Sequence, residues 1–421
     1  MDCLCSGSKW GKHAALLPRR LGEPRADGGN GLAITKGMTS WTPGSPEIRA
    51  LWALDPAVTY LNHGSFGATP RSVLAVQARL RDEMERSPVE FLARSWPERI
   101  GSVRQRVARF VGADPAGLAF VRNATAGVET ILGAFDWQAG DEIVFGDHGY
   151  NAVRQAIRRL EDAVGVKFVA AKIPFPLNSA SEVTQVFANA ITPKTRLVVV
   201  DHITSPTALI LPIEAIIALC RDRNVAVAVD GAHAPGMLAL DLDRLGADFY
   251  TGNLHKWLCA PKGAAILYVS RARRQKLHPK VISHGYQLGF HAEFDWTGTD
   301  DPTSWLAVPA AIDHADLLGT STLRAANHAL VRAGRVQIAT ALGVALPHPD
   351  DPALYGSMAT IPFPFVSQQD GPRLNAELYE THKIEVPFTG YDGRCFVRIS
   401  GQAYNAPEEY ERLAKVLVAY R

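Results

Sequence analysis

The sequence lacks a strong imbalance of charge. Its 421 residues hold 44 Lys and Arg against 42 Asp and Glu, which gives a formal net charge of +2. A chain with so even a balance has no global basic field, and we expect no nucleic-acid partner. Hydrophobic residues make up 47% of the chain, which is too apolar for a disordered protein.

Long hydrophobic runs are also missing. The most apolar stretch, 208–220, is shorter than the roughly 18 residues of a membrane span, and Pro212 and Glu214 interrupt it. We therefore expect no membrane segment. The length exceeds one ordinary domain of about 100–200 residues, so the chain can bury one large core or two.

Cysteine pairs and metal-ligand spacings are likewise absent from the sequence. The cysteines are Cys3, Cys5, Cys220, Cys259 and Cys395, without a CxxC or zinc pattern. Scattered thiols are typical of a reducing compartment, so we expect a cytoplasmic protein. The histidines show no ligand spacing, and we predict no metal. A P-loop and a GxGxxG motif after a strand are missing too.

The positive charge that the chain does have is concentrated in a glycine-rich leader. Residues 1–37 carry a net +3, which leaves −1 for the remainder of a chain whose total is +2. The apolar run 14–17 is too short for a secretory signal. We expect a disordered tail, or a true start at Met38.

Beyond residue 101 the sequence alternates between helical and strand patterns. Continuous β-branched runs separated by helices of 10–15 residues predict a mainly parallel sheet covered by helices, an α/β fold. Expected strands are 141–145, 166–173, 196–201, 225–230, 264–269, 359–365 and 395–399, and expected helices are 102–111, 151–164, 212–223, 305–318 and 407–420. We expect a large domain at 101–304 and a smaller α+β domain at 305–421, to which segment 38–100 contributes.

Polar residues recur where these strands end. The pairs Asp147-His148 and Asp201-His202 and the run 230–233 all follow apolar strands. Ligands of such sheets bind beyond the carboxyl ends of the strands, so one shared site is predicted there.

The most informative pair is Asp230 and Lys256, 26 residues apart. A lysine in a partly desolvated site can form a Schiff base with a carbonyl, and a buried carboxylate can keep a pyridinium nitrogen protonated. Together they describe pyridoxal phosphate chemistry. Taken singly, a strand-end aspartate is commonly a helix cap and most lysines are solvated.

Seven motifs in order carry a resemblance to a known family. They are LNHGSFGATP (61–70), NATAG (123–127), DGAHAPG (230–236), TGNLHKWLCAPKG (251–263), TGT (297–299), RIS (398–400) and YN (404–405). From about Asp55 to the C-terminus the chain resembles class V, fold-type I pyridoxal phosphate enzymes. The branch it resembles is isopenicillin N epimerase-like and related to cysteine desulfurases and hercynylcysteine sulfoxide lyases.

The resemblance implies a role for individual residues at the cofactor. Lys256 would carry pyridoxal phosphate and move protons at Cα, Asp230 would pair with the pyridine nitrogen, and His233 would lie near the ring. The further cofactor contacts that it implies are Ala124, Thr125, Thr251 and His255 at the phosphate, Tyr150 over the ring and Ser205 at the phenolic oxygen. Ser205 departs from the asparagine of desulfurases.

The resemblance also implies how substrate and partner are held. Arg398 would clamp the α-carboxylate of an amino-acid substrate, because its fixed fork of donors suits a carboxylate. Asn62 and His63 would lie near the substrate, with His63 either a catalytic group or a turn residue. Thr299 would reach the phosphate of a partner subunit, which implies a homodimer with shared active sites.

The reaction is left open by these residues. Cys259 and Cys395 flank motif residues rather than lying in a mobile loop, which disfavours a persulfide-forming desulfurase, and the short stretch 283–297 disfavours isopenicillin N. We favour C–S lyase β-elimination on an S-substituted cysteine. Epimerisation, transamination and decarboxylation remain alternatives, as does a non-catalytic protein of this fold.

Overall fold

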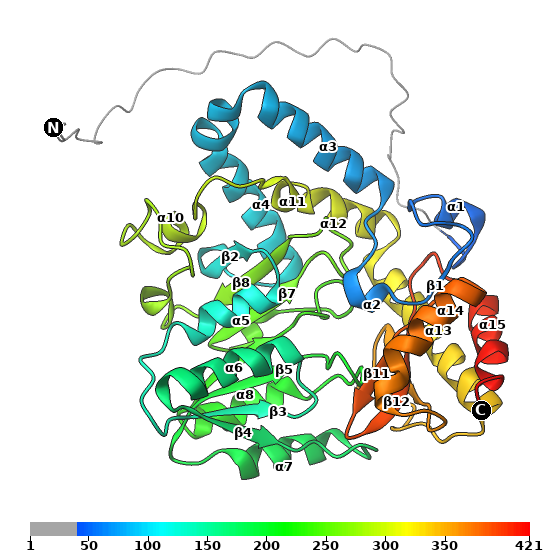
Figure 1. Ribbon diagram of the computed structural model, residues 1–421. Coiled ribbons are helices and arrows are strands. Elements are labelled where there is room, and N and C mark those ends of the chain that lie inside the picture. Colours follow the sequence, from blue (N-terminus) through cyan, green and yellow to red (C-terminus); the bar gives the residue numbers. More distant parts are fainter. Residues whose placement is uncertain (1–39) are drawn as a thin grey trace, which may run out of the picture. The chain divides into compact units, whose positions relative to one another are not determined.

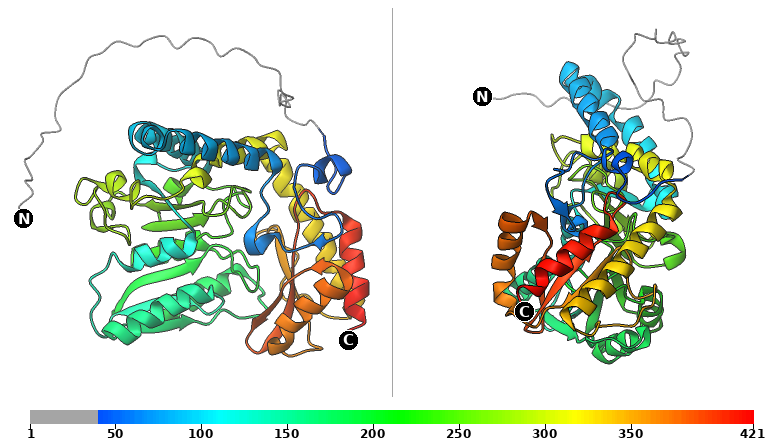
Figure 2. Two further views of the ribbon diagram at one scale, coloured as in Figure 1. Left: turned by 45° about the horizontal axis from the view of Figure 1, so that its top comes forward. Right: turned by 90° about the vertical axis from the view of Figure 1, so that its right-hand side faces the viewer.

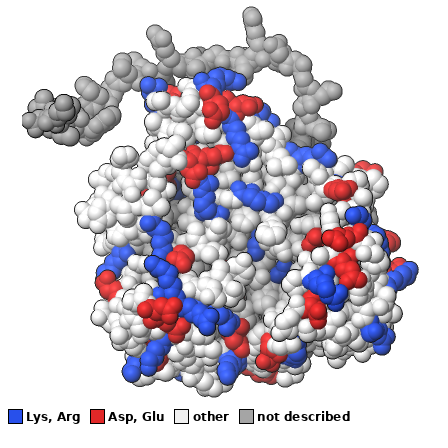
Figure 3. Space-filling view, in the orientation of Figure 1, with Lys and Arg blue, Asp and Glu red and all other residues white. Residues whose placement is uncertain are grey.

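The computed structural model describes residues 40–421, which fall in one compact unit, Lys36–Arg421 (Figure 1). The expected disordered leader 1–37 and the start at Met38 lie outside the described residues. No helix within 40–421 is long and apolar enough to cross a membrane. Basic and acidic side chains are interspersed over the face drawn in Figure 3.

A seven-stranded sheet forms the centre of the larger lobe, in the order β2-β8-β7-β6-β5-β3-β4. Its strands are Leu118–Val121 (β2), Glu142–Gly146 (β3), Lys167–Ala171 (β4), Thr195–Asp201 (β5), Ala226–Asp230 (β6), Phe249–Asn253 (β7) and Ala265–Val269 (β8). Strands β3 to β7 are parallel, and β8 runs antiparallel to β7 and β2. The predicted α/β fold with a mainly parallel sheet is confirmed.

Helices cover both faces of this sheet because its strands are apolar on both sides. In β5, Val198 and Val200 face one core, and Leu197 and Val199 face the other. The first core is closed by Trp96–Val111 (α4), Ala180–Ala190 (α7), Ile213–Asp222 (α8) and Val308–Leu317 (α12), and the second by Ala124–Leu132 (α5) and Asn151–Val164 (α6). Helix Arg71–Arg86 (α3) lies along Thr303–Leu306 (α11) and α12 (Figures 1 and 2).

A smaller lobe is built around an antiparallel sheet of Phe388–Tyr391 (β11), Arg394–Ser400 (β12) and Met358–Pro362 (β9). Its helices are Thr320–Leu342 (α13), Gly371–His382 (α14) and Pro407–Val418 (α15). Thr59–Tyr60 (β1) pairs in parallel with Ile384–Glu385 (β10), so backbone from before residue 100 joins this lobe. The domain boundaries expected from the sequence stay predictions. Short α-helices lie at Pro46–Arg49 (α1), His63–Phe66 (α2), Leu242–Leu245 (α9) and Phe290–Phe294 (α10), a π-helix at Glu90–Arg94, and 3₁₀ helices at Pro115–Gly117, Arg274–Lys276 and Gln368–Asp370.

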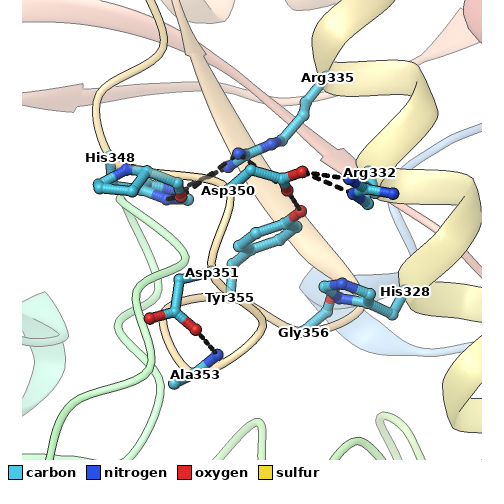
Figure 4. A network of polar contacts seen from close by, with 10 residues as sticks. His328, Arg332, Arg335, His348, Asp350, Asp351, Ala353, Tyr355 and Gly356 are labelled. Carbon is cyan, nitrogen blue, oxygen red and sulfur yellow. Dashed lines mark hydrogen bonds and ion pairs between the residues drawn. The ribbon is translucent and has the colours of Figure 1, made fainter.

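The loop between α13 and β9 is fixed by a buried arginine. Arg335 is 1% exposed, stacks 4.0 Å from the ring of Tyr355 and donates to Asp350 and to the ring of His348 (Figure 4). The same loop accepts hydrogen bonds from the larger lobe, where Leu177 N donates to Pro347 O and Ile210 N donates to Leu354 O. The network therefore fixes a loop that joins the two lobes.

Arg335 and Arg332 allow a matched test of this network, because both pair with Asp350 but only Arg335 is buried. We expect Arg335→Met to lower the unfolding free energy by about 3 kcal/mol, since it removes the donor to the buried His348 ring and the cation stacked on Tyr355. Arg332, 62% exposed, should cost less than about 1 kcal/mol as Arg332→Met. Urea denaturation of both variants measures the difference, and equal losses would contradict the structural role.

Candidate active site

The candidate site is a cavity of about 350 Å³ at the carboxyl ends of β3, β5, β6 and β7. Two of these strands end on the carboxyls Asp201 and Asp230, which line the cavity. The residues predicted from the sequence that line it are Ala124, Thr125, Tyr150, Ser205, Asp230, His233, His255 and Lys256. The ends of β5 and β6 therefore share one cavity, and its role as a ligand site stays a prediction.

Other polar residues at the strand ends do something else. His148 is fully buried and bonds Thr207 at 2.7 Å through Nδ1, while Asp147 accepts from the Tyr391 hydroxyl of the smaller lobe at 2.7 Å. His202 bonds the hydroxyl of Tyr250 at 2.9 Å. These residues tie strands and lobes together, so the prediction that they share the ligand site was wrong.

Lys256 lies at the centre of the site, in the turn after β7. Its Nζ is 3.1 Å from Nε2 of His233. The pKa of Lys256 is lowered to about 7, chiefly by burial and then by the charge of Arg398, while Asp230 opposes the shift. A substantial fraction of the amine is therefore neutral near pH 7, the form that attacks a carbonyl.

Two carboxyls lie next to one another at the ends of β5 and β6. Asp201 and Asp230 are register partners and are each 3% exposed. Burial raises the pKa of Asp230, while the Ala232 amide and Lys256 act against the shift. Burial and then the neighbouring Asp230 raise the pKa of Asp201 well above its ordinary range, and its Oδ2 has no hydrogen-bond partner among the described residues.

The opposite end of the cavity is the N-terminus of α5. Asn253 Oδ1 accepts from the Ala124 amide at 2.8 Å and Asn123 Oδ1 accepts from the Ala126 amide at 2.8 Å. The Thr125 amide and hydroxyl remain at the cavity wall, where a helix N-terminus favours an anion. Thr251 lies behind this wall, donates to Ile266 O at 2.9 Å and does not line the cavity.

Arg398 of β12 reaches the site from the smaller lobe. It is 4% exposed, donates to Ser205 O at 2.7 Å and to Ser65 Oγ at 2.9 Å, and its Nε has no partner within the described chain. No carboxylate of residues 40–421 forms an ion pair with it. Burial lowers the pKa of Arg398 to about 10. A buried cation held only by neutral oxygens is suited to an incoming carboxylate.

The turn at residues 62–67 lies beside the cavity and contributes part of its wall. His63 is fully buried; its Nε2 donates to Lys256 O at 3.0 Å and its Nδ1 bonds the Tyr404 hydroxyl at 2.8 Å. Asn62 donates to Glu385 at 2.9 Å. Of the two roles open for His63, the geometry favours the turn residue, and it is Ser65 and Phe66 that line the cavity.

Thr299 lies away from the cavity, on an exposed segment. Tyr150, 44% exposed, caps α6 at the cavity wall.

Some residues of the cavity wall were not predicted from the sequence. They are Ser65, Phe66, Arg122, Asn123, Asp201, Ile203, Ala232, Asn253, Lys262 and Gly263. Several lie inside the motifs quoted above, so motif membership was the available signal.

The groups that line the cavity fit pyridoxal phosphate. The cavity offers an amine to its carbonyl in Lys256, a buried carboxyl to its ring nitrogen in Asp230, and an uncapped helix amide and hydroxyl to its phosphate in Thr125. Across residues 40–421, no group of three or more His, Cys, Asp or Glu side chains is arranged to hold a metal ion.

Comparison with known proteins adds three findings. A family model described as aminotransferase class V matches residues 68–413. Isopenicillin N epimerase of Streptomyces clavuligerus is 34% identical over 89% of this chain and 97% of its own, and putative L-cysteine desulfhydrase 1 of Oryza sativa subsp. japonica is 32% identical over 85% and 82%. The apo structure of cysteine desulfurase from Thermococcus onnurineus NA1 has a TM-score of 0.76 at 20% identity over 91% of this chain and 99% of that chain.

The buried carboxyl of Asp201 predicts a pH dependence of stability. The pKa of Asp201 is higher in the folded state than in the unfolded state, so the folded state binds more protons. The protein therefore loses stability as the pH rises above about 4, the pKa of an aspartate in the unfolded chain. We expect Asp201→Asn to stabilise the apo-protein by at least about 1 kcal/mol at pH 7, a gain that shrinks towards pH 4. Denaturation across this range measures it, with Asp82→Asn on exposed α3 as the control. A pH-independent effect would contradict the assignment.

Proposed function

Because this chain belongs to the class V aminotransferase family of pyridoxal phosphate-dependent enzymes, we propose that it is a C–S lyase that catalyses β-elimination on an S-substituted cysteine. The predicted family, enzyme class and cofactor are confirmed. The observation that carries the proposal is that Lys256 and Asp230 line one cavity, while the buried Arg398 guanidinium donates to Ser205 and Ser65 of the cavity wall.

The roles of the side chains follow from their positions. Pyridoxal phosphate, when bound, supplies an electron sink for bonds at Cα. Lys256 provides the amine that holds it and then moves the Cα proton, since the lowered pKa of this lysine leaves a base available near pH 7. Asp230 stabilises positive charge at the ring nitrogen, and Arg398 holds the α-carboxylate and thereby sets which Cα bond is cleaved.

The cysteines support elimination over persulfide formation. Attack on a substrate sulfur requires an accessible thiolate. Cys259 and Cys395 are 3% exposed, and burial raises their pKa to about 12 and about 11. Neither thiol lines the cavity. The free, buried state of Cys220, Cys259 and Cys395 also supports a reducing compartment, and we propose the cytoplasm.

Epimerisation at Cα is the second candidate, favoured by the 34% identity to isopenicillin N epimerase. Both reactions begin with removal of the Cα proton and need Lys256, Asp230 and Arg398. They part at the next step, because elimination expels the β-sulfur whereas epimerisation returns a proton to the opposite face. The similarity of 32% to an L-cysteine desulfhydrase supports the first course.

The test is a substrate screen of the purified holoenzyme with cysteine and S-substituted cysteines, analysed by mass. We expect pyruvate, ammonia and a free sulfur fragment in equal amounts. In Lys256→Ala, the absorbance band of the lysine-bound cofactor should disappear and turnover should fall by at least about 10²-fold. Inversion at Cα without release of sulfur would replace the lyase by an epimerase, and absence of both products would contradict either function.

The expected homodimer is part of the proposal, with Thr299 reaching the phosphate site of the partner subunit. Its support is the exposure of Thr299 away from its own cavity. We expect a solution mass of twice 45.7 kDa and, in Thr299→Asp, at least about tenfold weaker cofactor binding, because a carboxylate repels the phosphate.

Subunit mixing tests whether Thr299 acts in trans. A heterodimer of one Lys256→Ala and one Thr299→Asp subunit would place both lesions in one site and leave the other site intact. Co-expression with two tags should therefore restore about half of the activity per heterodimer, whereas no recovery would show that Thr299 acts within its own subunit. Ser181→Asp on exposed α7 serves as the charge control.

A further inference from the structure

Trp257, which directly follows Lys256, lies between two histidines. It is 3% exposed, and its ring lies 4.8 Å from that of His63. Its indole N–H donates to His233 Nδ1 at 3.3 Å. Trp257 does not line the cavity, and its polar contact with a residue that does is the hydrogen bond to His233.

The indole hydrogen bond decides which tautomer His233 adopts. An indole nitrogen is a donor only, so the Nδ1 that receives its hydrogen must be unprotonated. A neutral imidazole with bare Nδ1 carries its hydrogen on Nε2. If the His233 ring were doubly protonated, its Nδ1–H would face the indole N–H of Trp257, and two donors would meet without an acceptor. The ring is neutral for a second reason, since burial and then Lys256 hold the pKa of His233 well below its ordinary value.

The tautomer in turn selects the state of Lys256. His233 Nε2, now a donor, lies 3.1 Å from Lys256 Nζ. Only a neutral amine can accept that hydrogen, because an ammonium has no lone pair. We propose that Trp257 is a positioning residue that fixes His233 as the Nε2–H tautomer and thereby holds Lys256 as the free amine.

Backbone packing keeps this chain of contacts in place. Gly236, at φ +93°, closes the turn that carries His233, and a Cβ there would overlap the backbone of Trp257 and Leu258. On the other side, His63 holds Lys256 O at 3.0 Å. Neither His233 nor Trp257 can therefore move away from the other without moving the Lys256 turn.

Other charged groups shift the pKa of Lys256 whichever tautomer His233 adopts. The titratable and charged groups around Lys256 and His233 are Asp230 of β6, Arg398 of β12, His255 of the lysine turn, His63 of α2, and Lys262 beyond. Asp230 favours the ammonium, whereas burial and Arg398 disfavour it. Trp257 differs from all of these because its contribution is one hydrogen, which can be removed while ring, burial and charges stay.

Trp257→Phe removes that hydrogen. The His233 ring can then move its proton to Nδ1 and accept from the Lys256 ammonium at Nε2. The readout is the pH dependence of the rate at which the apo-enzyme takes up pyridoxal phosphate, followed by absorbance. We expect its midpoint to rise by about one pH unit or more, which slows uptake about tenfold at pH values below both midpoints. Trp52→Phe, which loses a buried indole N–H at a position 2% exposed, should leave the midpoint unchanged.

A double-mutant cycle tests whether the effect passes through His233. In a His233→Ala background, Trp257→Phe should no longer shift the midpoint. A shift that persists there would show that Trp257 acts by packing alone and would overturn the proposal, as would a Trp257→Phe midpoint equal to wild type.

The tautomer can also be read directly in the unmodified apo-protein. Nitrogen-15 NMR of histidine-labelled protein should show His233 protonated at Nε2, and protonation at Nδ1 would overturn the proposal even if the variants fail to fold. The inference rests on the proposed role of Lys256, but these readouts need no turnover. A failed substrate screen with an Nε2–H His233 would therefore contradict the reaction and leave the tautomer standing.

Discussion

The backbone around Lys256 is held between two turns that approach it closely, and the rest of the site depends on this contact. Gly67, at φ +72°, lies against the carbonyl of His255, and Gly236 lies against the backbone of Trp257. A side chain at either glycine would push the lysine turn off the strand ends. Two motifs distant in sequence thus serve one purpose, which is to fix a reactive amine without touching it.

Burial of charge on both lobes gives the site its chemistry. Asp201, Asp230 and Lys256 come from the larger lobe, and Arg398 comes from the smaller. The two lobes are joined next to these groups. Each strand of the smaller sheet contacts the segment after β5, where Thr360 donates to Thr207 O, Thr389 to Pro206 O and Arg398 to Ser205 O. The segment after β5 therefore fixes the position of the smaller lobe relative to the larger one.

Sequence patterns predicted the elements whose signal is local. Helix α6 matches its predicted bounds, 151–164, because its amphipathic period is uninterrupted. The predicted helix 305–318 is two helices, α11 and α12, with a break at Ala307, before Pro309. The 23-residue α13 was missed because Asn327, Gly334 and Arg335 occupy buried positions on the face that packs against β9 and α15, which weakens its apolar stripe.

The residues of the candidate site can likewise be separated into those with a local sequence signal and those without one. Motif residues at strand ends and at the first turn of α5 were found, because their type alone suggests chemistry. Asp201 was noted but not selected, since its importance comes from the register that sets it beside Asp230. Thr251 was placed at the phosphate, but its side chain lies beneath α5, against Gly127, where it donates to Ile266 O. Trp257 lies in the motif 251–263, but its residue type suggested no role there, because only the fold brings its indole to His233.

The serine partners of Arg398 have a consequence for what the cavity admits. Within the described chain the guanidinium donates only to the neutral oxygens Ser205 O, Ser205 Oγ and Ser65 Oγ. A primary amine without a carboxylate would bring a second positive charge to a buried cation and gain nothing in return. We therefore expect the proposed carboxylate site to discriminate against biogenic amines by charge repulsion.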